Sequence, residues 1–164
     1  MANNNPWLYA GPSSSYPNIS RAPDNKTPIC PDDLSDPSSL PPCKTFTKPI
    51  SPGAPPTLTP TPIADAPSWS LMVFRYNNRL YAIDSACPHQ GYPMTNATLS
   101  DIEDFGIVLS VGVTCPRHGW TFDLHTGDAS VSRYRLGLYE VETREGEDGE
   151  EGVWVRKKER KRIG

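Results

Sequence analysis

The stretch CPHQGYPM, residues 87–94, places Cys87 and His89 two residues apart in a segment that also contains proline and glycine. A second pair follows in CPRHGW, where Cys115 and His118 are three residues apart. Thiolate and imidazole are both metal ligands. One such pair alone is usually a packing arrangement, but two pairs in similar loops favour a shared metal site.

The first pair is expected to follow a β-hairpin. Residues 69–76 and 79–84 are rich in β-branched and aromatic side chains, and they flank Asn77 and Asn78. Asparagine tolerates the positive φ angles of a two-residue hairpin turn. The predicted hairpin leads directly into Cys87.

Further strands are expected after the first pair. Residues 106–114 read as a strand that leads into Cys115, and residues 120–124 as its return. Residues 135–142 and 153–155 read as a last hairpin around an acidic loop. Residues 99–106 have little strand character and fit a helical turn or a loop equally well. These patterns predict an all-β, mostly antiparallel domain.

The N-terminal part of the chain differs in composition, because 15 of the 19 prolines lie before residue 65. Residues 1–42 are predicted to be a disordered Pro/Ser-rich arm, since they can bury little apolar surface. The predicted domain is 43–157, with a possible edge strand at 43–50 and a Pro-rich linker at 51–64. Residues 158–164 are predicted to be a basic, solvated tail.

Composition and charge suggest the setting of the protein. The net charge of −3 gives no reason to expect nucleic acid as a partner. No secretory signal, transit peptide or membrane-length apolar run is readable, so the expectation is a cytoplasmic monomer. Two disulfides among the four cysteines would suit a secreted protein, whereas a reducing cytosol favours metal binding or free thiols.

The residues alone leave two metals open. Two thiolates and two imidazoles satisfy a tetrahedral zinc ion. They also suit a two-iron, two-sulfide cluster in which the two cysteines hold one iron and the two histidines the other. A zinc finger commonly takes both cysteines from one hairpin, whereas here each loop supplies one cysteine and one histidine.

The motifs CPHQG and CPRHGW, followed by TFDLHTG, resemble the cluster-binding loops of Rieske-type iron–sulfur proteins, specifically the ferredoxin branch. RLYAIDSACPHQG resembles the entry hairpin of that family, and the resemblance covers about residues 69–155. It implies an antiparallel β-sandwich with a small cluster-binding subdomain of two loops. It also implies a [2Fe-2S] cluster, with Cys87 and Cys115 on the inner iron and His89 and His118 on the outer iron. Exposed imidazoles would couple the electron affinity of the cluster to proton binding.

Two departures from the high-potential branch of the family bear on the redox potential. That branch has a disulfide-bonded cysteine in each loop, where this chain has Tyr92 and Arg117. It also has hydroxyl donors where this chain has Trp120 and Phe122. Fewer hydrogen bonds to sulfur destabilise the reduced cluster. We therefore expect a potential at the low end of the Rieske range, about −150 mV.

These features favour a carrier of single electrons between a reductase and an acceptor such as an oxygenase, rather than an enzyme acting alone. After the cluster takes two histidines, only His125 is left, which is too few for a mononuclear iron site with two histidines and a carboxylate. No nucleotide-binding fingerprint is present. The alternatives are a zinc-binding or degenerate interaction module, or a small subunit of a larger oxidoreductase.

Overall fold

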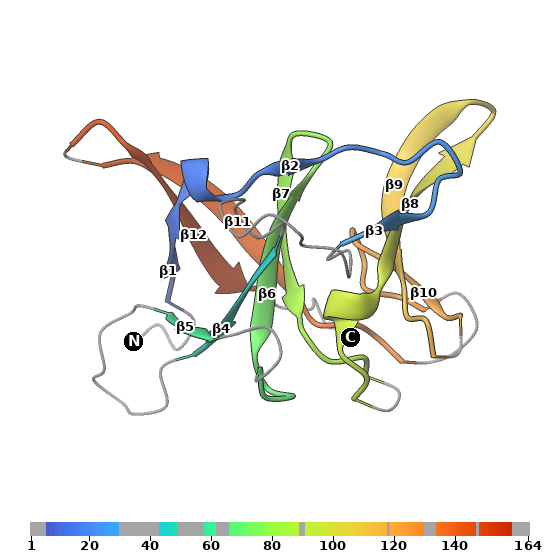
Figure 1. Ribbon diagram of the computed structural model, residues 1–164, viewed down its shortest axis with the longest axis horizontal. Helices are drawn as coiled ribbons and strands as arrows, with labels where there is room; N and C mark the ends of the chain where they lie inside the picture. The colour runs from blue at the N-terminus through green and yellow to red at the C-terminus, as the bar shows by residue number, and fades with distance from the viewer. Residues whose placement is uncertain are drawn as a thin grey trace, which may run out of the picture.

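Two β-sheets form the framework of the protein (Figure 1). The computed structural model describes residues 6–29, 43–48, 58–61, 66–88, 91–117, 119–129, 134–146 and 148–158. Within these residues the regular structure is almost entirely β, so the predicted all-β class is confirmed. No helix among them is both long enough and apolar enough to span a bilayer.

The larger sheet has eight strands. They are β1 (Leu8–Pro12), β2 (Asn18–Ile19), β4 (Cys43–Thr47), β5 (Thr59–Thr61), β6 (Leu71–Tyr76), β7 (Arg79–Asp84), β11 (Leu138–Glu145) and β12 (Glu151–Lys157). The order is β1-β12-β11-β7-β6-β4-β5, and β2 also pairs with β6. That last pairing is parallel, whereas the others in this sheet are antiparallel.

The smaller sheet has four strands in the order β10-β9-β8-β3. They are β3 (Thr27–Pro28), β8 (Thr98–Asp104), β9 (Ile107–Thr114) and β10 (Thr121–Asp123), and two short helical turns, η1 (Ser13–Ser15) and η3 (Met94–Asn96), complete the described elements. The β8–β9 and β11–β12 hairpins project at opposite ends of the molecule (Figure 1).

The predicted hairpins are confirmed. In β6–β7 the register pairs Tyr76 with Arg79, so Asn77 and Asn78 form the turn, with φ angles of +48° and +67°. Both values lie in the left-handed region that asparagine accepts. β9 pairs with β10, and β11 pairs with β12, as expected. The last hairpin is longer than predicted because its ladder continues into the acidic segment.

The structure differs from the sequence prediction in residues 99–106, most of which belong to strand β8. β8 pairs with β9 from Thr98 to Asp104, so the neighbouring strand supplies the order that local propensity did not indicate. One face of β8 is buried through Leu99 and Asp101. The Asp101 carboxylate accepts hydrogen bonds from the Tyr76 hydroxyl and from Arg21.

The predicted disordered arm is contradicted in residues 6–29. These residues form β1, β2 and β3, which pair with β12, β6 and β8 respectively. Leu8, Ala10 and Tyr16 are buried, and the Tyr16 hydroxyl donates to the Ala10 carbonyl at 2.5 Å. The segment is ordered because its few apolar side chains pack on a sheet that the sequence does not display. Residues 30–42 lie outside the described residues.

Two further predictions about the proline-rich part are wrong. β4 was expected at an edge but lies between β5 and β6. β5 itself falls inside the predicted flexible linker, and its Thr61 pairs with Thr45 of β4. The Thr45 hydroxyl donates to the Thr61 carbonyl at 2.8 Å, which adds a side-chain contact to this short ladder.

The cysteines do not all follow the expectation of metal binding or free thiols. Cys43 at the start of β4 is disulfide-bonded and fully buried. Cys87 and Cys115 are free of disulfides and are also buried. Disulfides persist mainly in oxidising compartments, so the bond at Cys43 gives no support to the predicted cytoplasmic location.

Candidate functional site: two equivalent cysteine loops

The first candidate loop begins just after β7. The Cys87 amide donates to the Tyr92 carbonyl at 2.8 Å, and the Gly91 amide donates to the Cys87 carbonyl at 2.8 Å. The loop is held at its base by a bridge between Ala86 and Pro93. Gly91 has a φ of +72°. This conformation suits glycine, which has no Cβ to clash with the backbone.

The second candidate loop begins just after β9 and repeats this arrangement. The Cys115 amide donates to the Trp120 carbonyl at 2.9 Å, and the Gly119 amide donates to the Cys115 carbonyl at 2.9 Å. Gly119 has a φ of +71°. In both loops, therefore, the cysteine carbonyl accepts a hydrogen bond from the amide four residues later. The cysteine amide donates to the carbonyl five residues later.

The two cysteines at the bases of these loops are close to one apolar core. Both belong to the same buried cluster, together with Met94, Phe122 and Leu136. Tyr92 and Trp120, the closing residues of the loops, are partly buried against that cluster. The fold therefore presents two buried cysteines, neither in a disulfide, from two loops closed by the same pair of backbone hydrogen bonds.

The predicted histidine ligands, His89 and His118, lie outside the described residues. In the sequence each falls between the cysteine and the glycine of its loop frame. Among the described residues alone, no group of three or more histidine, cysteine or acidic side chains could hold a metal ion. The donor set present, two buried thiols, fits the cysteine half of the predicted [2Fe-2S] site.

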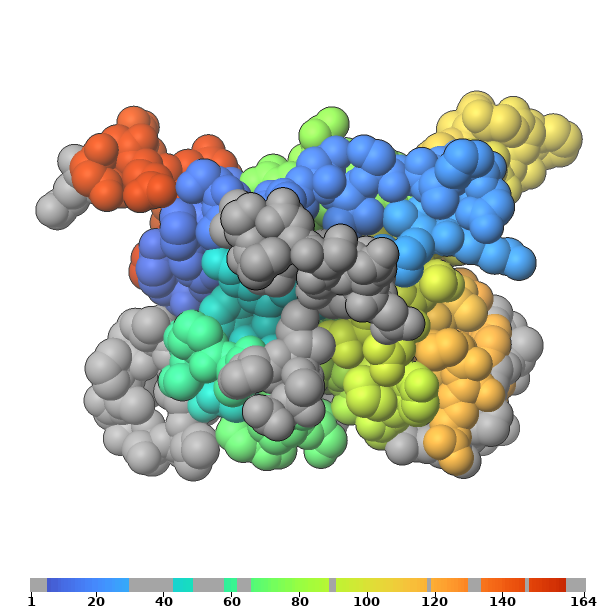
Figure 2. Space-filling view, viewed as in Figure 1, coloured from blue at the N-terminus to red at the C-terminus, as the bar shows by residue number. Residues whose placement is uncertain are grey.

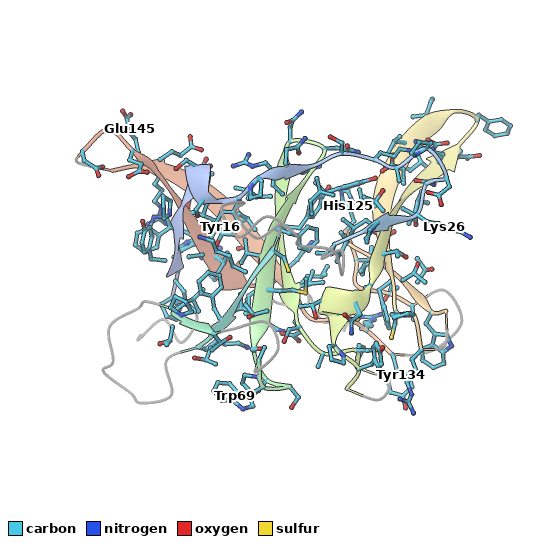
Figure 3. All side chains as sticks on the ribbon, viewed as in Figure 1. Tyr16, Lys26, Trp69, His125, Tyr134 and Glu145 are labelled. Atoms are coloured by element: carbon cyan, nitrogen blue, oxygen red, sulfur yellow. The ribbon has the colours of Figure 1, made fainter. Side chains whose placement is uncertain are left out.

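Aromatic side chains lie beside the second loop. The Trp120 and Tyr134 rings are in tilted contact, with centroids 5.6 Å apart, and Tyr134 is partly exposed. Figure 3 shows Tyr134 and Trp69 on the same, lower side of the view, with Tyr134 further to the right. Sequence reasoning identified Trp120 but missed Tyr134, because nothing local marks a residue 14 positions away as its neighbour.

The surface around the loops is accessible. Pro116, Arg117 and Gly119 of the second loop are exposed, and so is Gly91 of the first. A shallow depression beside the first loop is lined by small side chains, among them Ser85, and by no acid or base. The Ser85 hydroxyl lies 2.5 Å from that of Ser70, so it is already engaged.

The third histidine, His125, lies in the turn after β10, as expected, and is exposed. Its Nδ1 atom lies 2.7 Å from the Ser110 hydroxyl, which also donates to Asp123 at 2.6 Å. The His125 amide donates to the same Asp123 carboxylate at 2.7 Å. These contacts close the corner after β10 and do not involve the cysteine loops.

The fold and the site define an all-β protein that carries paired cysteine loops at strand ends. Comparison with known proteins identifies the class more closely. Residues 55–135 match the Rieske [2Fe-2S] domain family, and this part of the chain belongs to that family. Membership in an iron–sulfur family supports a role in electron transfer. No curated protein sequence matches the chain.

Two solved structures are similar to this chain. One is a chain of the complex of reduced oxygenase and oxidized ferredoxin in carbazole 1,9a-dioxygenase, with a TM-score of 0.52 and 21% identity over 94% of this chain and 97% of that chain. Another is a putative NADH-dependent nitrite reductase small subunit from Mycobacterium tuberculosis, with a TM-score of 0.47 and 13% identity over 93% and 96% of the two chains. At 21% identity, the first comparison supports the fold.

Proposed function

We propose that this protein is an electron carrier that binds a Rieske-type [2Fe-2S] cluster through Cys87, His89, Cys115 and His118. The observation that carries the proposal is the equivalence of the two loops. Each has a buried cysteine at its base, a glycine with positive φ four residues later, and the same pair of backbone hydrogen bonds. Two such loops suit a centre that takes one sulfur and one nitrogen ligand from each.

The burial of the two cysteines fits the inner position of their iron. Cys87 and Cys115 are 4% and 2% exposed, so thiolates at these positions are shielded from water and from oxidation. Phe122 and Met94 belong to the same buried core cluster as the two cysteines. A bound cluster of this type supplies reversible one-electron exchange, and the histidine-ligated iron has the higher potential that neutral ligands confer.

The exposed loop surface fits exchange of electrons with partner proteins. Pro116, Arg117 and Gly91 are exposed, so a partner can approach both loops. After the proposed cluster takes two histidines, His125 alone remains in this sequence, so we propose a separate donor and a separate acceptor. A reductase as donor and an oxygenase as acceptor are the partners we propose, and a ferredoxin and an oxygenase occur together in the similar solved complex. Transient redox encounters need only small interfaces.

The proposed potential is at the low end of the Rieske range, about −150 mV. Phe122 has no hydroxyl, is fully buried, and belongs to the same core cluster as the two cysteines. A Phe122→Tyr variant would place a hydroxyl there, and a hydrogen bond to sulfur stabilises the reduced state. We expect its midpoint to be higher than that of the wild type in a redox titration. An unchanged or lower midpoint would contradict this account of the potential.

The ligand set is tested by metal analysis and electron paramagnetic resonance after anaerobic purification. We expect equal amounts of iron and acid-labile sulfide, and a reduced spectrum typical of histidine ligation. The double variant His89→Cys/His118→Cys should give an all-cysteine cluster whose potential falls toward about −400 mV. His125→Ala is the matched control and should leave the spectrum unchanged. One zinc ion per chain, with no visible absorption, would instead support the interaction module.

A further inference from the structure

Two serine hydroxyls meet in the core beside the first candidate loop. Ser70 directly precedes β6 and is fully buried, and Ser85 directly follows β7 and is also buried. Their Oγ atoms lie 2.5 Å apart. Figure 2 shows residues 66–70, in green, and residues 91–96, in yellow-green, on the same lower side of the molecule. Ser85 lies two residues before Cys87, so this pair adjoins the first candidate ligand.

Side-chain and backbone hydrogen bonds both tie the two serines together. The Ser85 hydroxyl donates to the Ser70 carbonyl at 2.9 Å, and the Ser85 amide donates to the same carbonyl at 3.0 Å. The Ser70 hydroxyl donates to the Pro67 carbonyl at 2.6 Å. Two hydroxyl protons are therefore shared among three short contacts, which fix Ser85 against the segment that leads into β6.

Ser85 is in turn connected to both ends of the first loop. Ahead of the loop, the chain runs from Ser85 through Ala86 to Cys87. Behind the loop, the Met94 amide donates to the Ser85 carbonyl at 2.7 Å, and Pro93 forms its bridge with Ala86. A displacement of Ser85 would therefore move Cys87 and the returning chain together.

The second loop is held differently, because paired strands lie on both of its sides. β9 leads into it and β10 leaves it, and the ladder between them begins at Thr114 and Thr121, directly below the loop. Behind the first loop, by contrast, the chain enters the single helical turn η3. The serine pair thus supplies at the first loop a restraint that a strand ladder supplies at the second.

A comparable hydroxyl pair lies away from the loops. The Thr45 hydroxyl of β4 donates to the Thr61 carbonyl of β5 at 2.8 Å, and the Thr61 hydroxyl donates to that of Thr45 at 3.1 Å. Thr45 is as deeply buried as Ser70, and neither β4 nor β5 leads into a candidate ligand loop. This pair therefore offers a matched control for the loss of a buried hydroxyl.

We propose that Ser70 and Ser85 are positioning residues, which hold Cys87 in its buried place for the cluster. This inference rests on the proposed function, because it assigns the pair a role toward the same centre. Groups behind the ligands of a metal centre orient those ligands, and a site whose ligands are already in place binds more tightly. Both hydroxyls act through the loop backbone, since their own hydrogen bonds are made to protein atoms.

Alkylation of the cysteines in the full-length chain, freed of metal by a chelator, tests the position of Cys87. Cys87 is 4% exposed, so iodoacetamide reacts with it when the loop opens. Loss of a buried hydrogen bond shifts an opening equilibrium about fivefold or more. We therefore expect Ser85→Ala to raise the alkylation rate of Cys87 relative to Cys115 by at least about fivefold, as measured by peptide mass spectrometry.

Two further variants sharpen the alkylation test. Ser70→Ala should change the rate ratio in the same direction by a smaller factor, because the Ser85 hydroxyl keeps its bond to the Ser70 carbonyl. This milder variant also provides the answer if Ser85→Ala does not fold. Thr45→Val removes the hydroxyl of the control pair and should leave the ratio unchanged.

Loss of visible absorbance in a chelator gives a second readout on the loaded protein. It should be at least about fivefold faster for Ser85→Ala than for the wild type, and unchanged for Thr45→Val. An unchanged rate ratio or an unchanged loss of cluster in the serine variants would overturn the proposal. An equal rise in Thr45→Val would do so too, because it would indicate global unfolding. A wild-type protein without visible absorbance would instead refute the proposed function, while the alkylation ratio would still decide whether the pair positions Cys87.

Discussion

Replacing Tyr16 with alanine tests whether the N-terminal segment belongs to the fold, as the structure shows and the sequence did not indicate. The Tyr16 ring is 2% exposed and belongs to a core cluster of the larger sheet that includes residues of β1 and β12. Its hydroxyl donates to the Ala10 carbonyl at 2.5 Å, and Lys44 Nζ lies 4.9 Å from the ring centroid. A disordered arm would contain no such contacts.

The magnitude follows from these contacts. Truncation of a buried aromatic side chain to alanine costs about 3–5 kcal/mol, through lost burial and the cavity left behind. The hydroxyl contributes about 1 kcal/mol of that, because its loss leaves the Ala10 carbonyl without its donor. We therefore expect Tyr16→Phe to lower the free energy of unfolding by about 1 kcal/mol and Tyr16→Ala by about 4 kcal/mol.

Urea-induced unfolding of the three proteins measures both differences. Ser14→Ala is the matched control, because Ser14 lies two residues away, is exposed, and makes one hydrogen bond of 3.3 Å to Glu150. It should change stability by less than about 0.5 kcal/mol. A Tyr16→Ala protein as stable as the control would refute the reasoning, since the segment could not then be docked on the sheet.

Three further predictions concern other parts of the fold. Burial raises the pKa of Tyr16, so the tyrosine ionises first in the unfolded state. Stability should therefore fall as pH rises above about 10. In pH-dependent thermal melts, Tyr16→Phe should flatten this decline. In urea unfolding, Gly119→Ala should cost about 1–2 kcal/mol, because only the φ of Gly119 is unfavourable for alanine. Gly127→Ala should cost more, because its Cβ would lie 2.5 Å from the Leu136 carbonyl oxygen. Equal costs for the two variants would contradict this. A reductant should lower the melting temperature of the wild type but not of Cys43→Ala, and an equal response would argue against the disulfide.

Sequence patterns predicted the elements that depend on local chemistry. The Asn77-Asn78 turn, the strands leading into both cysteines and the last hairpin all follow from turn residues and β-prone runs. The family was also recognisable, because its motifs are short, contiguous and chemically specific. The assignment of His89 and His118 as ligands stays a prediction.

Other elements could not be predicted because their stability comes from distant partners. β8 has acidic residues that disfavour a strand in isolation, yet β9 pairs with it along its whole length. β1 and β5 lie in proline-rich segments, where low apolar content correctly argues against independent folding. β1 is ordered because β12 supplies hydrogen bonds and because its Leu8 and Ala10 are buried in the core. β5 remains largely exposed and is held by its hydrogen bonds to β4.

The sequence by itself predicted the chemistry of the candidate site, because the cysteines and histidines proposed as ligands and the glycine of each loop lie within a few residues of one another in the chain. Only the tertiary structure decided that the two loops share one backbone geometry and that both cysteines enter a single buried cluster. It also decided which cysteine is disulfide-bonded and which hairpin leaves its apolar residues in water. These properties depend on contacts between residues far apart in the sequence, and local patterns contain no information about such contacts.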